Sequence, residues 1–464
     1  MPLEIHKFGG AALKDAQGFR RVAEIIKKFC ARTEVIVVVS AIEGMTNALE
    51  RMARSALSGE IPPTTDFFGS HLRIISDLGL RSQLGTYLGH ADTRLRGLLA
   101  AVQTLKQLPS ATLDEIWSFG ECTAAHILAT LLDPDSPGYV PAESLIAAEG
   151  FGSGRVDHRR TRRWIEKWWQ WWHSRRGHIV PVIPGFLARE LQSGRVCTLG
   201  RNGSDFTASM LGSYIKAALI RLWKCGVDGV YTADPRFVRQ AQHLRSVTFE
   251  EAAEGSYAGA QVVATDAAVL ASRHNLRLWI GNTENPDGPG TFIEPRNDAA
   301  HTGGVRMVTH LSACALLNVQ GLGMIGVTGT ARRVFAAMET AGINVHLISQ
   351  AGSEHSIAFV VRERDSDRAI RELKREFSRE TRERRISKIE RLPNVAILSI
   401  VGEGMKGTPG IVGKLGTALG KAKVNIRVTA QGPSEHATSL VIDADEVPTA
   451  LQAVHRAFKL YRLG

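Results

Sequence analysis

Cysteine is scarce in this chain, and no stretch of it stays apolar for long. Among 464 residues there are five cysteines, and no two have the close spacing of a zinc knuckle or a redox dithiol. We therefore expect reduced thiols, a cytoplasmic location and no metal site built by the protein itself. No apolar run reaches the roughly 20 residues that cross a bilayer, and the first residues do not resemble a signal peptide, so we expect no membrane partner.

Acidic residues are outnumbered by basic ones, and the formal net charge is +11. The basic residues gather in two stretches expected to be helical, 159–172 and 365–391, and form no recognised nucleic-acid-binding motif, so we expect no nucleic-acid partner. In the first stretch, Trp164, Trp168, Trp171 and Trp172 would share one helical face. We expect this helix to pack on the protein core or on another subunit; a helix on a membrane surface is the alternative.

Two glycine-rich clusters indicate phosphate chemistry. Lys7-Phe8-Gly9-Gly10 follows the short apolar start of the chain, and residues 200–205 read Gly-Arg-Asn-Gly-Ser-Asp. A Gly-Gly turn lets backbone N–H groups approach phosphate oxygens, and the neighbouring lysine adds a positive charge. The second cluster could add a guanidinium, a hydroxyl and the carboxylate of Asp205, which also suits a helix N-cap. Together they predict phosphoryl transfer, which depends on positioning and charge stabilisation.

Apolar runs alternate with amphipathic stretches through the first 295 residues. We expect a helix from Gln17 to Phe29, a buried strand from Glu34 to Val39, and another over 178–186. This order favours an α/β fold with a mostly parallel open sheet between helices, with ligands at the carboxyl ends of its strands. Turn-forming residues near 281–291 predict that this domain, residues 1–295, ends there.

The second half of the chain contains an internal repeat offset by about 81 residues. Each copy predicts a strand, a glycine turn, an amphipathic helix, two strands and a helix, which is typical of a small βαββαβ ligand-binding module. We place the modules at 306–390 and 394–464, joined by a charged helix over 365–391. The recurring polar and glycine residues predict an amino-acid effector site: Gly326, Gly329, Asn344 and Gln350 in the first copy, with Asn425 and Gln431 in the second.

These motifs resemble those of aspartate kinases, enzymes of the amino-acid-kinase fold followed by two ACT modules. The resemblance covers nearly the whole chain and is closest to the kinase part of threonine-sensitive aspartate kinase–homoserine dehydrogenase fusions. The segments that carry it are Lys7–Gly10, Val39–Ala41, Ser118–Glu121, Pro184–Phe186, Thr198–Asp205, Val227–Arg236 and Asn282 with Thr283.

The resemblance implies that MgATP phosphorylates the β-carboxylate of L-aspartate in amino-acid biosynthesis. Lys7, Gly9 and Gly10 would hold the phosphates, and Asp205 would orient Lys7 or the attacking carboxylate. Arg201 would bind the substrate α-carboxylate through paired hydrogen bonds, and Glu121 would bind the α-ammonium. The remaining implied contacts are Ser40, Thr46, Phe186 and Ser204 for aspartate, and Asp228, Tyr231, Asp234 and Arg236 for the nucleotide. Threonine or lysine would act as effector, and the ACT modules would pair subunits into a homodimer or larger homo-oligomer.

Several residues depart from the family pattern, mostly near the expected nucleotide site. Ala11 and Ala12 replace hydroxyl residues, Lys224-Cys225-Gly226 stands where Thr-Asp is usual, and Gln261 and Gly281 each replace a lysine. Loss of one charged phosphate donor costs roughly 2–4 kcal/mol of barrier. Two alternatives therefore stay open: a weak or inactive regulatory homologue, and a kinase for another amino-acid carboxylate.

Overall fold

The computed structural model describes residues 1–176, 178–200, 202–260, 262–295, 304–350 and 352–463. Their contacts divide the chain into two compact units. The first contains residues 1–229, 245–249 and 263–295, and the second contains residues 230–244, 250–262 and the chain from 296 onward. Residues 230–244 and 250–262 thus belong to the second unit, whereas the sequence boundary at 295 places them in the first domain.

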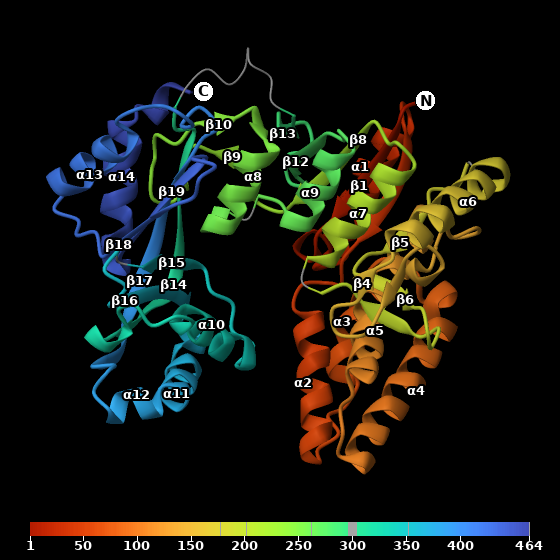
Figure 1. The fold of residues 1–464 in the computed structure, drawn as a ribbon. Coiled ribbons are helices and arrows are strands. Elements are labelled where there is room, and N and C mark those ends of the chain that lie inside the picture. Colours follow the sequence, from red (N-terminus) through yellow and green to blue (C-terminus); the bar gives the residue numbers. More distant parts are fainter. Residues whose placement is uncertain (177, 201, 261, 296–303, 351, 464) are drawn as a thin grey trace. The chain divides into compact units, whose positions relative to one another are not determined.

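A seven-stranded sheet forms the centre of the first unit (Figure 1). Neighbouring strands are parallel except for one antiparallel pair, β12 with β13, which confirms the mostly parallel sheet. In order across the sheet, the strands are β11 (Ser246–Thr248), β13 (Thr291–Glu294), β12 (Leu278–Asn282), β8 (Leu219–Lys224), β1 (Leu3–Phe8), β2 (Glu34–Val39) and β5 (Val182–Pro184).

Helices cover both faces of this sheet because its strands are apolar on both sides. Val35, Val37 and Val39 join the hydrophobic cluster that contains residues of α1 and α5. On the other face, α7 comes so close to the sheet that a Cβ on Gly212 would lie 2.8 Å from the Ile220 side chain. Helix bounds are α1 (Ala16–Cys30), α2 (Met45–Ser58), α3 (Thr65–Asp77), α4 (Arg81–Leu105), α5 (Ser110–Leu132), α7 (Gly203–Tyr214) and α9 (Thr265–Arg273).

The tryptophan-rich stretch forms α6 (His158–Arg176) beside a small second sheet. Trp172 is buried, and its Nε1 donates to the carbonyl of Ile179 at 3.1 Å. Trp171, which we expected on the same face, is 48% exposed, because the buried face contains Thr161, Ile165 and Trp172 and residue 171 lies one position away from it. The small sheet comprises β4 (Arg155–Val156), β3 (Ala147–Glu149), β6 (Leu187–Glu190) and β7 (Val196–Thr198).

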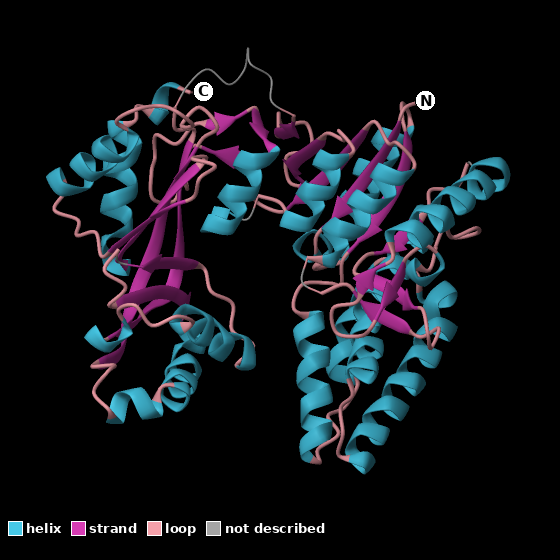
Figure 2. Cartoon of the chain, in the orientation of Figure 1, coloured by secondary structure: helices cyan, strands magenta, loops and turns pink. Residues whose placement is uncertain are grey.

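The second unit is built around a six-stranded antiparallel sheet (Figure 2). Its strand order is β15 (Leu347–Gln350), β16 (Ser356–Arg362), β14 (Met307–Gln320), β17 (Lys388–Val401), β19 (Ala437–Asp443) and β18 (Val428–Gln431). The helices are α8 (Phe249–Gly255), α10 (Thr330–Thr340), α11 (Ser366–Glu376), α12 (Ser378–Arg382), α13 (Ile411–Lys421) and α14 (Val447–Ala457), and a short hairpin pairs β9 (Val230–Tyr231) with β10 (His243–Leu244).

The two long strands β14 and β17 are shared between the repeats. Residues 314–320 of β14 pair with β16, and residues 316–320 also pair with residues 388–392 of β17, which completes the first module. Residues 307–311 of β14 pair with 397–401 of β17, which also pairs with β19, so the second module takes its fourth strand from before the first. The strands change register where Ala313 and Asn394 adopt positive φ angles of 56° and 55°.

Two details of the repeat therefore differ from the sequence expectation. The charged stretch 365–391 is not one helix: it contains α11, then α12, then the start of β17 at Lys388. The described residues after α14 form a short 3₁₀ turn, Leu460–Arg462, where a final strand was expected. The physical reason is that 307–311 already occupies that edge of the sheet.

Candidate functional site

The predicted site residues of the first unit gather at the carboxyl ends of parallel strands. Gly9 and Gly10 follow β1, Ser40 follows β2, and Phe186 comes two residues after β5. Lys224 ends β8 and Asn282 ends β12. Because β1 lies between β8 and β2, it separates a β2–β5 side from a β8–β12 side. Open α/β sheets bind ligands at this end.

Lys7 and Asp205 form a buried ion pair at this end of the sheet. Lys7 Nζ lies 2.6 Å from Asp205 Oδ1, and both side chains are at most one-tenth exposed. Asp205 lies in the first turn of α7, where the helix dipole also favours a negative charge. Burial raises the pKa of Asp205, but the ammonium groups of Lys7 and Lys224 more than offset this, so the pKa lies below its usual value and the carboxylate is ionised.

Glu121 is a buried carboxylate on α5 near the same lysine. It is 4% exposed, and its Oε2 has no hydrogen-bond partner among the described residues. Burial raises its pKa to about 8, and the N–H of Ala41 and the charge of Lys7 offset only part of that shift. A buried carboxyl group with one oxygen lacking a partner can bind a cation, because an ammonium beside it would supply that partner and favour the ionised form.

The chain is packed tightly around these groups. A Cβ on Gly10 would collide with the carbonyl oxygen of Ala41, so the turn after β1 requires glycine there. A Cβ on Gly185 would lie 2.6 Å from the Cβ of Ser204, which is itself buried. Phe186 has a positive φ of 71°, a strained angle for a phenylalanine, and its N–H donates to Thr207 Oγ1 at 3.2 Å. Ser40 is half-buried just after β2, and Thr46 is half-buried in the first turn of α2.

Asp114 is a positioning residue that sequence reasoning missed. It is fully buried, its Oδ1 accepts from Thr198 Oγ1 at 2.8 Å, and its Oδ2 accepts from the N–H groups of Thr198 and Gly152. These bonds fix the segment that leads into residues 200–205. The available signal was the adjacent acidic pair Asp114-Glu115 in the helical stretch that leads to Ser118–Glu121.

On the β8–β12 side, the turn after Lys224 is anchored by Asn282. Asn282 Oδ1 accepts from the N–H of Gly226, whose φ is 70°, and Asn282 Nδ2 donates to Asp228 Oδ1 at 3.1 Å. The structure thus brings Asp228 to Asn282. It also explains Gly281, because the indole ring of Trp279 occupies the place that a Cβ at residue 281 would take.

The other predicted nucleotide contacts lie in the second unit. Tyr231 ends β9, and Asp234 forms an ion pair with Arg236 at 2.6 Å. Their segment packs on the second repeat, where Thr232 Oγ1 lies 3.0 Å from His455 Nε2. The predicted contact Arg201 and the departure at Gln261 lie outside the described residues.

The predicted effector residues occupy equivalent positions in the two repeats. Gly326 and Gly329 have positive φ angles of 69° and 85°, and Gly407 and Gly410 repeat them at 68° and 84°. Each loop is held by a glutamate that was not among the predicted site residues: Glu354 accepts from the N–H of Gly326 at 3.1 Å, and Glu435 from that of Gly407 at 2.6 Å. The amide side chains are exposed: Asn344 and Gln350 in the first copy, Asn425 and Gln431 in the second.

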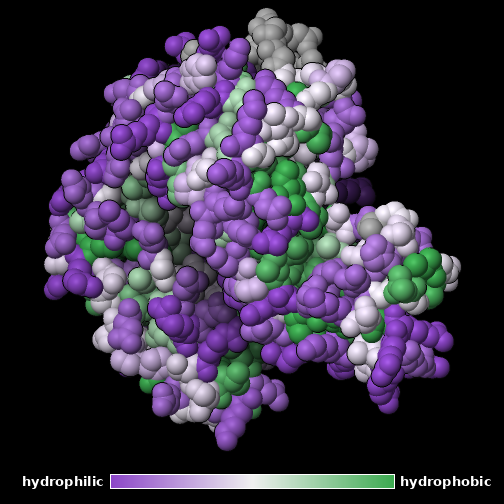
Figure 3. All heavy atoms as spheres, turned by 90° about the vertical axis from the view of Figure 1, so that its left-hand side faces the viewer, coloured by the Kyte–Doolittle hydropathy of each residue, from purple (hydrophilic) through white to green (hydrophobic). Residues whose placement is uncertain are grey.

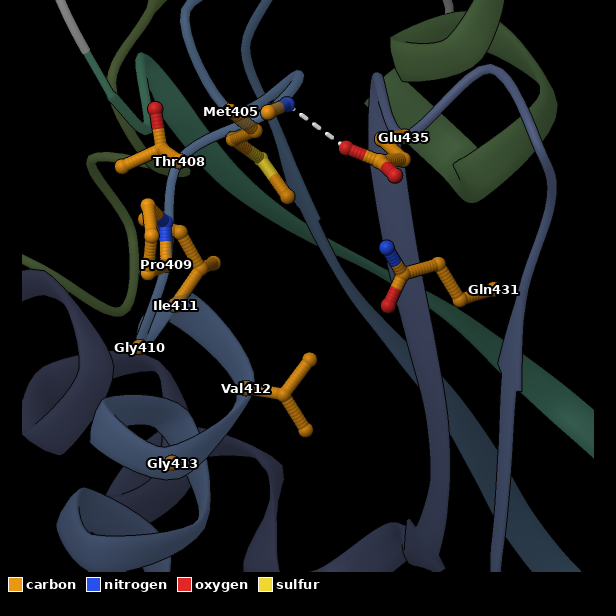
Figure 4. Close-up of a pocket in the computed structure, with 10 residues that line it drawn as sticks. Met405, Thr408, Pro409, Gly410, Ile411, Val412, Gly413, Gln431 and Glu435 are labelled. Carbon is orange, nitrogen blue, oxygen red and sulfur yellow. Dashed lines mark hydrogen bonds between the residues drawn. The ribbon is translucent and has the colours of Figure 1, made fainter.

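A pocket of about 330 Å³ lies beside the glycine loop of the second repeat. Figure 4 shows Gln431 and Val412 extending into it from opposite sides, and the dashed line marks the hydrogen bond to Glu435. Its lining residues are Met405, Gly407, Thr408, Pro409, Gly410, Ile411, Val412, Gly413, Gln431 and Glu435. The pocket therefore contains one predicted amide and the equivalents of both predicted glycines.

Two kinds of feature are absent from the described residues. Among them, no helix is both long and apolar enough to cross a membrane. Nor do three or more His, Cys, Asp or Glu side chains within the described ranges converge as metal ligands would. On the face of the molecule shown in Figure 3, hydrophilic side chains predominate, with smaller hydrophobic areas between them.

Family comparisons agree with this arrangement. Residues 2–282 match the model of the amino acid kinase family, and residues 317–377 and 398–458 each match an ACT domain. The two ACT matches coincide with the two repeats.

Among curated proteins, the chain is 32% identical over 472 residues to bifunctional aspartokinase/homoserine dehydrogenase 2 of Arabidopsis thaliana. That alignment covers 99% of this chain and 51% of the plant protein, and the chain spans about half the length of the first such relatives. It is also 30% identical to aspartokinase 1 of Arabidopsis thaliana, covering 98% of this chain and 80% of that protein.

Among solved structures, E. coli aspartokinase III in complex with lysine and aspartate (T-state) matches with a TM-score of 0.80. The identity is 23%, and the match covers 98% of this chain and 99% of that chain. The same enzyme in complex with aspartate and ADP (R-state) matches with a TM-score of 0.79, 23% identity and coverage of 98% and 100%. These matches confirm the fold expected from the sequence, an amino-acid-kinase fold followed by two ACT modules.

Proposed function

Since this chain belongs to the amino acid kinase family, among the aspartokinases, we propose that it phosphorylates the β-carboxylate of L-aspartate with MgATP. A carboxylate oxygen attacks the γ-phosphorus, the bond from that phosphorus to the ADP oxygen breaks, and 4-phospho-L-aspartate forms. The carboxylate nucleophile is already ionised near neutral pH, so the reaction needs charge stabilisation and positioning more than a general base.

The buried carboxyl of Glu121 beside Lys7 is the observation that carries this proposal. One oxygen of Glu121 has no hydrogen-bond partner among the described residues, and Lys7 lies near enough to affect its pKa. An amino acid whose α-ammonium group binds Glu121 therefore lies next to Lys7. Lys7 precedes the Gly9–Gly10 turn, which is proposed to bind the phosphates. Phosphoryl donor and acceptor meet at Lys7.

The remaining roles follow the family resemblance. Lys7, Gly9 and Gly10 hold the transferring phosphate, and Asp205 keeps Lys7 in place. Ser40, Thr46, Phe186, Ser204 and Arg201 bind aspartate, and Asp228, Tyr231, Asp234 and Arg236 bind the nucleotide, with Mg²⁺ arriving as part of MgATP.

We propose the regulatory role for the ACT modules and the catalytic role for residues 1–295. The effector of the ACT modules is an amino acid, threonine or lysine. It binds at the glycine loops and contacts the amides of Asn344, Gln350, Asn425 and Gln431. These amides are exposed in one chain. They become a complete site when two subunits pair through the modules, which favours a homodimer or larger homo-oligomer; E. coli aspartokinase III was solved with lysine.

One assay tests the proposed function. Purified protein is incubated with MgATP, hydroxylamine and each of a panel of amino acids, because hydroxylamine converts an acyl phosphate into a hydroxamate, which forms a coloured complex with added ferric ion. We expect hydroxamate with L-aspartate and background colour with L-glutamate, L-asparagine and no amino acid. Colour with another amino acid would assign a different substrate, and no colour with any would favour the inactive homologue. Lys7→Ala protein is the control for contaminating kinases.

A further inference from the structure

Lys224 is a second cation at the candidate active site. It is the last residue of β8, and its Nζ lies 4.0 Å from Asp205 Oδ2, while Lys7 contacts the other oxygen of the same carboxylate at 2.6 Å. Lys7 is opposite Leu222 in the parallel register of β1 and β8, so Lys224, two residues further, lies on the same face of the sheet. The two ammonium groups thus flank one carboxylate.

The charges of this cluster do not cancel. Within the described residues, Asp205 is the one carboxylate within 4.0 Å of either ammonium. Glu121 is mainly protonated at neutral pH because burial raises its pKa to about 8. Burial lowers the pKa of Lys224, the Asp205 carboxylate offsets part of this shift, and the Lys7 ammonium adds to it. With both lysines protonated, two positive charges face one negative charge, and the Lys224 side chain is 28% exposed. A partly buried excess of positive charge is costly unless an anion binds beside it.

The position of Lys224 in the sheet indicates which anion this is. Among the residues proposed for aspartate, Ser40 and Phe186 follow β2 and β5 and Glu121 lies on α5, whereas β8 is on the opposite side of β1. The Trp223 carbonyl lies 3.9 Å from where a Cβ of Gly9 would be, so the end of β8 runs beside the Gly9–Gly10 turn. The Lys224 ammonium lies 4.0 Å from Asp205, and among the described residues no side-chain hydrogen bond of Lys224 is found, so within that part of the chain its donors remain available.

The backbone of Lys224 is held in place. Its carbonyl accepts from the N–H of Thr283 at 2.8 Å, and the turn that follows is bound through Gly226 to Asn282. A lysine on a fixed strand end is a pre-organised charge, which binds a phosphate without the cost of ordering a loop.

We propose that Lys224 binds the triphosphate of the nucleotide, as a second phosphate cation beside Lys7. This inference rests on the proposed kinase function, and it gives a positive role to a residue that departs from the family pattern. Lys224 supplies at β8 the positive charge that the chain lacks at Gln261, where the family pattern has lysine.

Calorimetric binding of MgATP and MgADP to the full chain, without aspartate, tests the proposal. We expect Lys224→Ala to raise the MgATP dissociation constant about ten- to hundredfold. Lys224→Arg, which keeps the charge, should recover most of the affinity. Lys27→Ala is the matched control, because Lys27 is an exposed lysine in the last turn of α1.

Aspartate binding to the same variants separates a phosphate contact from a structural role. If Lys224 only positioned Asp205, its replacement would lower the affinities for aspartate and MgATP together. The proposal instead requires the aspartate affinity of each variant to stay within about twofold of wild type. Thermal unfolding confirms that each variant is folded, and Lys224→Gln replaces any alanine variant that is not. Unchanged MgATP affinity, equal losses for both ligands, or wild-type protein that binds no MgATP would each overturn the proposal.

The two proposals fail separately. If wild type binds MgATP through Lys224 but produces no aspartyl hydroxamate, the proposed substrate is wrong and the phosphate role stands. If hydroxamate forms normally and Lys224→Ala binds MgATP like wild type, the proposed function stands and the role of Lys224 is wrong.

Discussion

The candidate catalytic site and the candidate effector site differ in how deeply their polar side chains are buried within one chain. Lys7, Asp205 and Glu121 are each less than one-tenth exposed. The amides of Asn344, Gln350, Asn425 and Gln431 are exposed. Buried charges must be paired and fixed in advance, because an unpaired one costs several kcal/mol, whereas exposed amides remain hydrated. The candidate catalytic groups are thus buried together within one chain, and we expect effector binding at the exposed amides to gain most when another surface covers them.

Lys7→Ala is the strongest way to break the catalytic half of this comparison. We expect the rate of hydroxamate formation to fall about 100-fold or more, because a charge at the transferring phosphate is lost in a largely buried place. Circular dichroism and thermal unfolding control for folding, since Asp205 loses its short ion pair. A variant that retained more than about a tenth of the wild-type rate would remove Lys7 from phosphoryl transfer.

Glu121→Gln should weaken the binding of aspartate and leave the binding of the nucleotide nearly unaffected. We expect the Michaelis constant for aspartate to rise about ten- to hundredfold, because a neutral amide cannot pair with the α-ammonium. The Michaelis constant for MgATP should change by less than about threefold. Equal changes in both constants would place Glu121 in the framework of the fold and not in substrate recognition.

The raised pKa of Glu121 gives this prediction a second, pH-dependent readout. With a pKa of about 8 in the free protein, Glu121 is protonated at pH 7, and an adjacent ammonium favours the ionised form. Aspartate binding at pH 7 should therefore release about one proton, and affinity should rise from pH 6 to about pH 8 and then level off. Calorimetry in two buffers of different ionisation enthalpy measures the proton, and Glu121→Gln should abolish its release.

Gly281→Lys, which restores the usual residue of the family, should destabilise the first unit by about 1–3 kcal/mol, because the Trp279 ring occupies the space of its Cβ. Chemical unfolding followed by tryptophan fluorescence measures the change. The double variant Trp279→Ala with Gly281→Lys should be less destabilised than the sum of the two single variants. Simple additivity would contradict the overlap.

The smallest expected effect concerns the effector half. Glu435→Gln should weaken the bond that holds the Gly407 loop and raise the half-inhibiting effector concentration by up to about tenfold. Glu354→Gln is the matched variant in the first copy and should have less effect, because its bond is longer and the described pocket lies at the second copy. Threonine and lysine are each titrated, with rates scaled to each variant's own uninhibited rate. Equal shifts would show that the two loops act alike.

The sequence predicted those features that depend on short stretches of chain. The β1 turn with Lys7 and Gly10, the strand Glu34–Val39 and the repeated glycine loops are local patterns, and each lies where expected. Features that depend on distant pairing were missed. Lys224 becomes a neighbour of Asp205 only when β8 lies beside β1, and Asp114 reaches Thr198 across 84 residues. Trp171 was placed wrongly because four tryptophans cannot all fit the narrow buried face of α6.

The strand Met307–Leu311 makes the order of synthesis matter for the regulatory half. It leaves the ribosome before either repeat is complete, yet its partner Ile397–Val401 follows about 90 residues later. The strand therefore stays unpaired while the first copy, which lies between the two partners in the chain, folds. Its pairing then closes a long loop, which is a slow step of high contact order. A cut between the copies would leave the second without an edge strand. A single copy therefore cannot be exchanged between relatives by itself. The exchanged segment must contain both copies and begin before residue 307.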